Sequence, residues 1–388
     1  MNTGTSTQDH FADELHRIDQ AGNLRTLRTA VHDGKHIIVD GRRMLNLSSN
    51  DYLGLAADGG MFSTFLSSLD DRVPAMSSSS SRLLTGNYPE FDHLERQLAA
   101  SYGKEAALTF NSGYNMNMGI LPAISDTSTL ILADKLVHAS LIDGLRLSAA
   151  KCIRYRHLDY RQLTDLVEKY ASTYPRIIIV TESVFSMDGD IADLALLADI
   201  KKKHSNVLLY VDEAHAAGVR GAHGLGIAEE QGCIDDIDFL CGTFGKALCS
   251  VGAYVVCSAM TREYLINKMR PFIFTTALPP LNAAWTSFVW ERLPDMDDRR
   301  RHLASISEKL RTCIARNGEC RSQSHIVPLI LGASTDATDK AERLQANGFY
   351  VLPLRPPTVP QGTSRLRLSL TAAIGDDDLS RLIKELEK

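Results

Sequence analysis

Short apolar segments alternate along the chain with longer segments of helical spacing, from about residue 90 onward. Apolar segments typical of strands lie at ALTF (107–110), TLILA (129–133), RIIIVTES (176–183), NVLLYVDEAH (206–215), DFLCGTFGK (238–246) and AYVVC (253–257). Helical patterns occur among them, for example over 90–103 and 160–172. Strands that are apolar throughout and interleave with helices indicate a mostly parallel sheet covered on both faces. The pattern therefore predicts an α/β fold, in which a site lies beyond the carboxyl ends of the strands.

The two ends of the chain have different patterns. Phe11, Leu15, Ile18 and Leu24 have helical spacing, which predicts an amphipathic helix over about 11–30. Residues 36–47 alternate and contain Asp40-Gly41, a hairpin signal. After ALPP (277–280) the pattern predicts a long helix, a strand over 324–331, a helix around 335–348, and strands in FYVLPL and RLRLSL. We expect these to form a smaller α+β domain.

Charge and composition exclude several classes of protein. The chain has 388 residues, with 42 basic and 47 acidic side chains and a net charge of −5, so there is no general electrostatic case for nucleic-acid binding. No stretch approaches ~18 consecutive apolar residues, so we expect no membrane helix. The N-terminus is polar and acidic without an apolar signal core, so we expect a cytoplasmic protein.

The seven cysteines do not predict a metal site. They include no CxxC pair, and the four at intervals of eight residues match no zinc pattern. We expect buried, reduced thiols and no bound metal.

A lysine follows one predicted strand directly. Lys246 closes the small-residue turn Thr243-Phe244-Gly245-Lys246, a position that favours a cleft. A nucleotide phosphate loop fails here, because Gly242 and Gly245 have the wrong spacing and Ala247 stands where a Ser or Thr must reach magnesium. Position alone leaves both a catalytic lysine and a surface lysine open.

Acidic and imidazole groups follow a second predicted strand, in Asp212-Glu213-Ala214-His215. A carboxylate at the end of a buried strand costs several kcal/mol unless it is paired, and a cationic ring nitrogen would pair it. His215 can hydrogen-bond within the same turn. An Asp that caps the next helix, or a divalent metal held by this cluster, remains an alternative.

Two further turns lie beyond strands. The glycine-containing turn Ser112–Tyr114 exposes backbone N–H groups at the start of a helix, which favours a phosphate. His138 follows another strand. Pyridoxal phosphate needs a lysine for the Schiff base, a carboxylate on the pyridine nitrogen, a phosphate cradle and a group packed on its ring. Lys246, Asp212, the Ser112–Tyr114 turn and His138 together supply all four.

The motifs, taken in order, resemble those of the α-oxoamine synthases, pyridoxal-phosphate enzymes of fold type I. The resemblance covers nearly the whole chain. It rests on SSNDYLGL (48–55), SRLLTGN (81–87), NSGYNMN (111–117), DKLVHASLIDG (134–144), TESVFSMDGD (181–190), VDEAHAAG (211–218), GTFGKAL (242–248), IFTTALPP (273–280) and RPPTVPQGTSRLRL (355–368). It implies an N-terminal helix and hairpin segment (1–47), a large cofactor domain (48–277) and a small C-terminal domain (278–388).

The resemblance also implies roles for individual residues. Lys246 should bind the cofactor covalently, and Asp212 should pair with the pyridinium. The remaining cofactor contacts are expected from His138 stacked on the ring, from His215 and Ser186 at the phenolic oxygen, and from Ser112, Gly113, Tyr114 and Thr243 at the phosphate. Thr275 or Thr276 should reach the phosphate of the partner subunit, because family sites lie at a homodimer interface.

Substrate contacts are expected from arginines. Alternation in RLRLSL places Arg365, Arg367 and Ser369 on one face, and the family pattern makes Arg367 the clamp for the amino-acid carboxylate. Arg355 and Thr358 should lie near the substrate. Arg25 matches a family arginine at the acyl-substrate entrance, although a solvated helix residue is the alternative.

The opening and closing motifs are most similar to the alanine-using branch of the family. That branch condenses L-alanine with pimeloyl-coenzyme A or pimeloyl-carrier protein, releases carbon dioxide and a thiol, and gives 8-amino-7-oxononanoate for biotin synthesis. Glycine with acetyl-coenzyme A, or serine with a long acyl thioester, is the alternative. Three departures from the family pattern, at Phe91, Ser77–Ser81 and Ile374, bear on the acyl substrate. They leave Lys246 and Asp212 untouched.

Overall fold

The computed structural model describes residues 7–56, 58–69 and 73–388. Its contacts divide the chain into two compact units. The first combines Met1–Ser49, Met187–Gly189 and Ala304–Lys388, and the second combines Asn50–Ser186 and Asp190–Leu303. The three-part functional division expected from the family stays a prediction.

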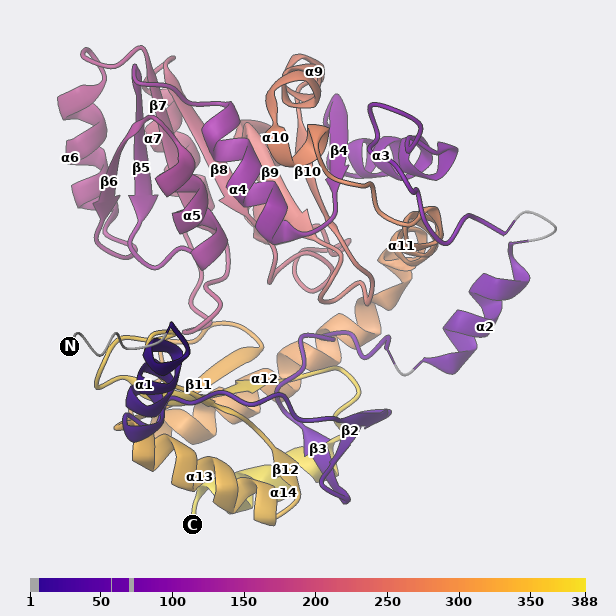
Figure 1. Cartoon of the computed structure of the whole chain (residues 1–388), viewed down its shortest axis with the longest axis vertical. Helices are drawn as coiled ribbons and strands as arrows, with labels where there is room; N and C mark the ends of the chain where they lie inside the picture. The colour runs from indigo at the N-terminus through magenta and orange to yellow at the C-terminus, as the bar shows by residue number, and fades with distance from the viewer. Residues whose placement is uncertain (1–6, 57, 70–72) are drawn as a thin grey trace, which may run out of the picture. The chain divides into compact units, whose positions relative to one another are not determined.

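A seven-stranded sheet forms the centre of the second unit (Figure 1). Its order is β4-β10-β9-β8-β7-β5-β6; β10 runs antiparallel to β4 and β9, and the pairs from β9 to β6 are parallel. All six predicted strands are present, so the mostly parallel sheet is confirmed. The strands are β4 (Ala106–Phe110), β5 (Thr129–Asp134), β6 (Lys151–Tyr155), β7 (Arg176–Glu182), β8 (Val207–Asp212), β9 (Phe239–Thr243) and β10 (Ala253–Cys257).

The strand β6 was not predicted, because it has no continuous apolar run. Only Tyr155 of its five residues is buried, as suits a strand at the edge of the sheet. The central strands β5 and β7 are buried almost throughout, which is why their apolar runs were recognisable.

Helices pack on this sheet, and α4 and α5 lie in front of it in the view of Figure 1. Side chains of Ser112, Asp159 and Asp193 cap three of the helices by accepting an N–H of the first turn. The helices are α2 (Gly59–Ser67), α3 (Pro89–Tyr102), α4 (Gly113–Ala123), α5 (Ala139–Leu147), α6 (Tyr160–Tyr170), α7 (Leu194–Lys202), α8 (Ile227–Glu230), α9 (Ala259–Lys268), α10 (Arg270–Ile273) and α11 (Pro280–Arg292). The helices predicted over 90–103 and 160–172 are therefore confirmed.

The prediction of a single long helix after residue 280 is wrong. The chain forms α11 and α12 (Asp297–Asn317), with a short 3-10 turn over Pro294–Met296 between them. Proline has no N–H to donate and clashes with the preceding turn, so Pro294 ends the first helix.

The first unit contains two small sheets. One has the order β1-β2-β3-β12 and the other β11-β14-β13. The predicted hairpin is confirmed: Asp40 and Gly41, with φ of 51° and 73°, form the two-residue turn between β2 and β3. The strands are β1 (Val31–Asp33), β2 (His36–Val39), β3 (Arg42–Asn46), β11 (Ile326–Gly332), β12 (Phe349–Tyr350), β13 (Pro353–Leu354) and β14 (Ser364–Ser369), and the helices are α1 (Thr7–Gln20), α13 (Ser334–Ala346) and α14 (Asp376–Leu386).

The N-terminal helix is shorter than predicted. α1 ends at Gln20 rather than near residue 30, because the chain turns at Gly22 with a φ of 66°. Its apolar side chains Phe11 and Leu15 are exposed. Among the described residues, no helix combines the length and apolar character needed to cross a bilayer.

A buried ionic cluster connects β5 to the loop after β7. The ring of His157 lies between two carboxylates, with Nδ1 at 2.9 Å from Asp134 and Nε2 at 2.6 Å from Asp190. Its edge also contacts the ring of Phe185. Burial by itself would lower the pKa of His157, but the hydrogen bonds and charges of Asp134 and Asp190 outweigh it and raise the pKa to about 9.

This cluster predicts a pH-dependent stability. Since the folded-state pKa of His157 lies above its unfolded value, its stabilising effect is complete below about pH 6.5 and is lost as the pH rises through about 9. We expect the free energy of unfolding to fall by up to about 3 kcal/mol across that range. His157→Gln should remove this dependence in urea denaturation, whereas His204→Gln should keep it. An equal slope in both variants contradicts the prediction.

Candidate active site

Three neighbouring strands deliver the central polar groups to one edge of the sheet. Glu182 ends β7 and is the register partner of Asp212 at the end of β8. Asp212 pairs in turn with Cys241 of β9, and Lys246 follows the end of β9 by three residues. The charge of Lys246 acts on both Glu182 and His138. The fold therefore gathers the lysine, the aspartate and the histidine expected from the sequence.

Asp212 is held rigidly although it is only 5% exposed. Its Oδ1 accepts the N–H of Ala214 at 2.9 Å, and its Oδ2 accepts Nδ2 of Asn117 at 2.7 Å. The two hydrogen bonds fix the orientation of the carboxylate. A buried anion at this place can pair with a cationic ring nitrogen, as the sequence analysis required.

His138 stands at the start of α5. Its ring Nδ1 accepts the backbone N–H of Ser140 at 3.2 Å, and the backbone N–H of His138 donates to Oε1 of Glu182 at 2.5 Å. Burial lowers the pKa of the His138 ring; the Asp212 charge opposes this change and the Lys246 charge adds to it. The ring is therefore neutral at physiological pH.

Sequence reasoning missed Glu182, although its position gave the same signal as Asp212. It is a carboxyl at the carboxyl end of an apolar strand, within the TES motif. Burial raises the pKa of Glu182 well above its usual range; the Asp212 charge adds to this, and the Lys246 charge and the His138 N–H oppose it. Burial therefore disfavours a charge on Glu182, which lies beside Asp212 in the sheet register.

His215 and Ser186 are both buried. Nδ1 of His215 lies 2.6 Å from the hydroxyl of Tyr52, which also donates to Oδ1 of Asn50 at 3.0 Å. Tyr52 and Asn50 belong to the SSNDYLGL motif, so this motif supports His215. Ser186 lies in the loop after β7, next to Phe185, whose backbone N–H donates to the carbonyl of Asp190.

The predicted phosphate turn has the expected geometry. Ser112 caps α4 through a 3.1 Å bond from the N–H of Asn115, while the first N–H groups of a helix have no partner within it. A Cβ at Gly113 would lie 3.9 Å from Oγ1 of Thr243, which places the two predicted phosphate-binding segments side by side. Oγ1 of Thr243 donates to the carbonyl of Gly252. An anion at this helix N-terminus would meet both backbone and hydroxyl groups.

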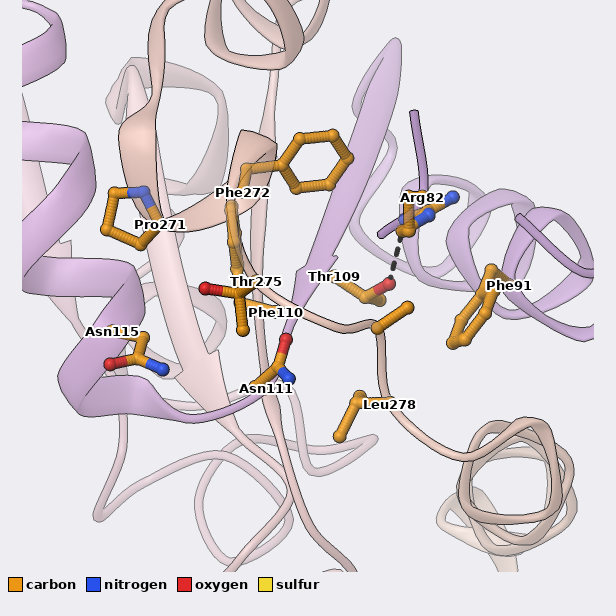
Figure 2. A pocket seen from close by; sticks show the side chains of 11 residues that line it. Arg82, Phe91, Thr109, Phe110, Asn111, Asn115, Pro271, Phe272, Thr275 and Leu278 are labelled. Atoms are coloured by element: carbon orange, nitrogen blue, oxygen red, sulfur yellow. Dashed lines mark hydrogen bonds between the residues drawn. The ribbon is translucent and has the colours of Figure 1, made fainter. Parts of the chain in front are cut away.

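Thr275 borders a narrow cavity of about 10 Å³, room for roughly one water, that Asn111 and Asn115 also line (Figure 2). The amide of Asn111 donates to the carbonyl of Thr276. One protomer therefore places Thr275 and Thr276 beside its own NSGYNMN segment. Their expected contact with a partner's phosphate stays a prediction.

The opposite wall of this cavity carries a buried ion network. Arg82 of the SRLLTGN motif pairs with Glu95 and donates to Oγ1 of Thr109 at 3.2 Å (Figure 2). Glu95 also accepts Arg262 at 2.8 Å. The guanidinium of Arg82 lies 4.8 Å from the ring centre of Phe91.

The three departures from the family pattern have separate structural environments. Phe91 is buried beneath Arg82. In the Ser77–Ser81 run, Ser78 is buried and donates to the carbonyl of Leu278. Ile374 is fully buried in the first unit. Their effect on the acyl substrate stays a prediction.

The expected substrate residues all lie in the first unit. Arg25 donates to Oγ1 of Thr358 at 3.0 Å, and Arg355 donates to the carbonyl of Gly22. The shared face of β14 is confirmed, because Arg367 donates to Oγ of Ser369 at 2.7 Å. The structure therefore brings Arg25, Arg355 and Thr358 together and places Arg367 on its predicted strand.

Comparison with known proteins gives the family. The model of the family described as aminotransferase class I and II matches residues 42–386. The chain belongs to this family. A protein of Glaesserella parasuis named putative 8-amino-7-oxononanoate synthase is 55% identical over 96% of this chain and 98% of its own. The 8-amino-7-oxononanoate synthase of Haemophilus ducreyi is 54% identical over 96% and 99%.

Solved structures agree with the fold. Serine palmitoyltransferase of Sphingomonas wittichii has a TM-score of 0.89 at 30% identity, over 99% of this chain and 98% of that one. The 8-amino-7-oxononanoate synthase of Francisella tularensis has a TM-score of 0.74 at 28% identity, over 89% and 98%. These matches confirm the resemblance to α-oxoamine synthases and the fold type I architecture.

The cofactor of this chain is pyridoxal 5'-phosphate, which is present in related serine palmitoyltransferase structures. The residues fit it. A buried carboxylate, a nearby lysine, a neutral histidine and a helix N-terminus beside a threonine hydroxyl are the donors and acceptors that this cofactor requires.

The ion network beside the cavity predicts a large stability effect. Glu95→Ala would leave two buried or half-buried arginines without their shared carboxylate, so we expect a loss of about 3–5 kcal/mol. Glu168→Ala, on the exposed side of α6, is the matched control and should change stability little. Urea denaturation measures both. Equal stabilities would show that the network contributes nothing.

Proposed function

We propose that this chain condenses L-alanine with a pimeloyl thioester to give 8-amino-7-oxononanoate, carbon dioxide and the free thiol. One observation carries the proposal above all: 51–55% identity, over nearly the full length, to proteins named 8-amino-7-oxononanoate synthase. The gathering of Lys246, Asp212 and His138 at one sheet edge supports it. The chain is thus a pyridoxal-phosphate-dependent acyltransferase of biotin synthesis.

Bound pyridoxal phosphate supplies an electron sink for the charge that develops when a bond to the amino-acid Cα breaks. We assign its covalent attachment to Nζ of Lys246. Asp212 would pair with the positive charge on the ring nitrogen, and its two hydrogen bonds hold the carboxylate in place. His138 would pack on the ring, while His215 and Ser186 would bind its phenolic oxygen.

The phosphate is assigned to the turn before α4. Backbone N–H groups of Gly113 and Tyr114 bind it at the helix N-terminus, together with Ser112 and the hydroxyl of Thr243. This cradle fixes the ring relative to Lys246, because Thr243 ends the strand that leads directly to the lysine.

On the substrate side, the guanidinium of Arg367 binds the alanine carboxylate bidentately. Arg25, Arg355 and Thr358 contact the acyl substrate. The hydrogen bond between Arg25 and Thr358 supports a shared role for these two residues.

The residues then carry out the following steps. Nζ of Lys246 would remove the Cα proton of the bound alanine and hold it. Cα would then attack the thioester carbonyl carbon as the bond to sulfur breaks, and the thiolate would leave and take a proton from solvent. The β-keto acid would lose its carboxylate as carbon dioxide, and the proton held at Nζ of Lys246 would return to Cα.

We further propose a homodimer with shared sites. An apolar groove of about 460 Å³ lies between α4 and the segment 268–275, and the side chain of Phe274 beside it is 71% exposed. A second copy would cover this face and bring Thr275 or Thr276 to the neighbouring phosphate.

The competing reaction is that of serine palmitoyltransferase, which condenses serine with a long acyl thioester. The structural similarity of this chain to that enzyme favours it. Sequence identity of 28–30% to those structures is well below the 51–55% of the named synthases, so alanine is the preferred substrate here.

A product assay tests the reaction directly. With pimeloyl-coenzyme A present, we expect mass spectrometry to detect 8-amino-7-oxononanoate from alanine and no comparable product from glycine or serine. Pimeloyl-carrier protein is compared at the same concentration, which identifies the acyl carrier. A preference for serine with a long acyl thioester would overturn the proposal.

Replacement of the lysine tests the site. Lys246→Ala should abolish product formation, since its Nζ is the atom assigned to bind the cofactor covalently and to move the Cα proton. It should also lose the covalent attachment that borohydride fixes in the parent protein. Lys203→Ala, an exposed lysine after α7, is the control. Full activity in Lys246→Ala would refute the assignment.

A further inference from the structure

A chain of buried hydrogen bonds links the two side chains assigned to the cofactor ring. Its centre is the side-chain amide of Asn117, only 1% exposed. Nδ2 donates to Oδ2 of Asp212 at 2.7 Å and to Oγ of Ser140 at 3.0 Å. Oδ1 accepts the hydroxyl of Tyr210 at 2.6 Å. Three partners thus use both amide hydrogens and the amide oxygen.

The partners fix the direction of every bond in this chain. The carboxylate of Asp212 only accepts, so the nitrogen side of the amide must face it. Ser140 then accepts the second amide hydrogen, which leaves its own hydroxyl hydrogen for Nδ1 of His138 at 2.9 Å. The backbone N–H of Ser140 points at the same Nδ1. With two donors directed at it, Nδ1 is an acceptor, and the ring proton lies on Nε2.

A close helix crossing makes this chain possible. Asn117 lies on α4 and Ser140 on α5. A Cβ at Gly144 of α5 would lie only 2.5 Å from the carbonyl oxygen of Asn117. A side chain at that position would force the helices apart and lengthen the bond between Asn117 and Ser140.

We propose that Asn117 is a positioning residue that fixes the Asp212 carboxylate and, through Ser140, holds His138 neutral with its proton on Nε2. The inference rests on the proposed function only for the roles of Asp212 and His138. One amide therefore positions both the Asp212 carboxylate, assigned to the ring nitrogen, and the His138 imidazole, assigned to the ring face.

The charged groups around His138 come from three strand ends and agree with this arrangement. Asp212 ends β8, Lys246 follows β9, and Glu182 ends β7 and accepts the backbone N–H of His138. A proton on Nδ1 would face the hydroxyl and backbone N–H of Ser140, which are both donors. Loss of either Asn117 or Ser140 removes part of this opposition, so His138 should then bind a proton more tightly.

Histidine NMR on the full-length chain tests the proposal. The ring nitrogens of His138, identified by their absence in His138→Gln, are titrated in the cofactor-free and the loaded protein. We expect a protonated Nε2 and an unprotonated Nδ1 in the parent chain. Ser140→Ala and Asn117→Leu should each raise the pKa of His138 by about one unit, roughly tenfold tighter proton binding, the equivalent of one lost hydrogen bond.

Ser148→Ala is the matched control. Ser148 closes α5 and shares a 2.6 Å hydrogen bond with Ser125 just after α4, so it links the same helices away from His138. In Ser148→Ala the pKa of His138 should equal that in the parent chain. If Asn117→Leu fails to fold, Ser140→Ala decides alone, since it leaves the bond between Asn117 and Asp212 in place.

Two results would overturn the proposal: a proton on Nδ1 of His138 in the parent chain, or titrations of the variants that match Ser148→Ala. Neither depends on which substrate the enzyme uses. A failed product assay with the expected NMR result would therefore reject the proposed function and leave the role of Asn117 standing.

Discussion

The burial of one carboxylate at the end of a parallel strand is the constraint on which the site depends. Asp212 loses most of its hydration, so it must be paired with donors from the protein and with a cationic partner. The N–H of Ala214 and the amide of Asn117 provide the first, and a pyridinium nitrogen would provide the second. Burial raises the pKa of its neighbour Glu182 and so disfavours a second negative charge at this place.

The parallel sheet explains how these groups meet. Strands β7, β8 and β9 run in the same direction, so their carboxyl ends lie at one edge, and the residues that follow them become neighbours. The two turns assigned to the phosphate meet in the same way, with Gly113 beside Thr243. Proximity here comes from strand order rather than from sequence separation.

Much of the fold was predictable because its signals are local. Continuous apolar runs identified six of the seven strands of the large sheet, and Asp40-Gly41 identified the hairpin. The predictions failed where the signal was weak or ended early. β6 is an exposed edge strand without an apolar run, and α1 ends at the turn of Gly22 although apolar spacing continues to Leu24. The apolar spacing after residue 280 predicted one long helix, but Pro294 divides it into α11 and α12.

Similar limits apply to the site. From the sequence alone, residue types after successive strands determined the cofactor, and motif order determined the family, because both depend on local chemistry. Glu182, Asn117 and Ser140 were not recognised, since nothing in a segment such as TES or NSGYNMN says which side chains meet in space. Only the tertiary structure decided that an amide on α4, a hydroxyl on α5 and a carboxylate on β8 form one hydrogen-bonded chain. Hydrogen bonds need atoms within about 3 Å, and that precision comes from helix crossing and strand register.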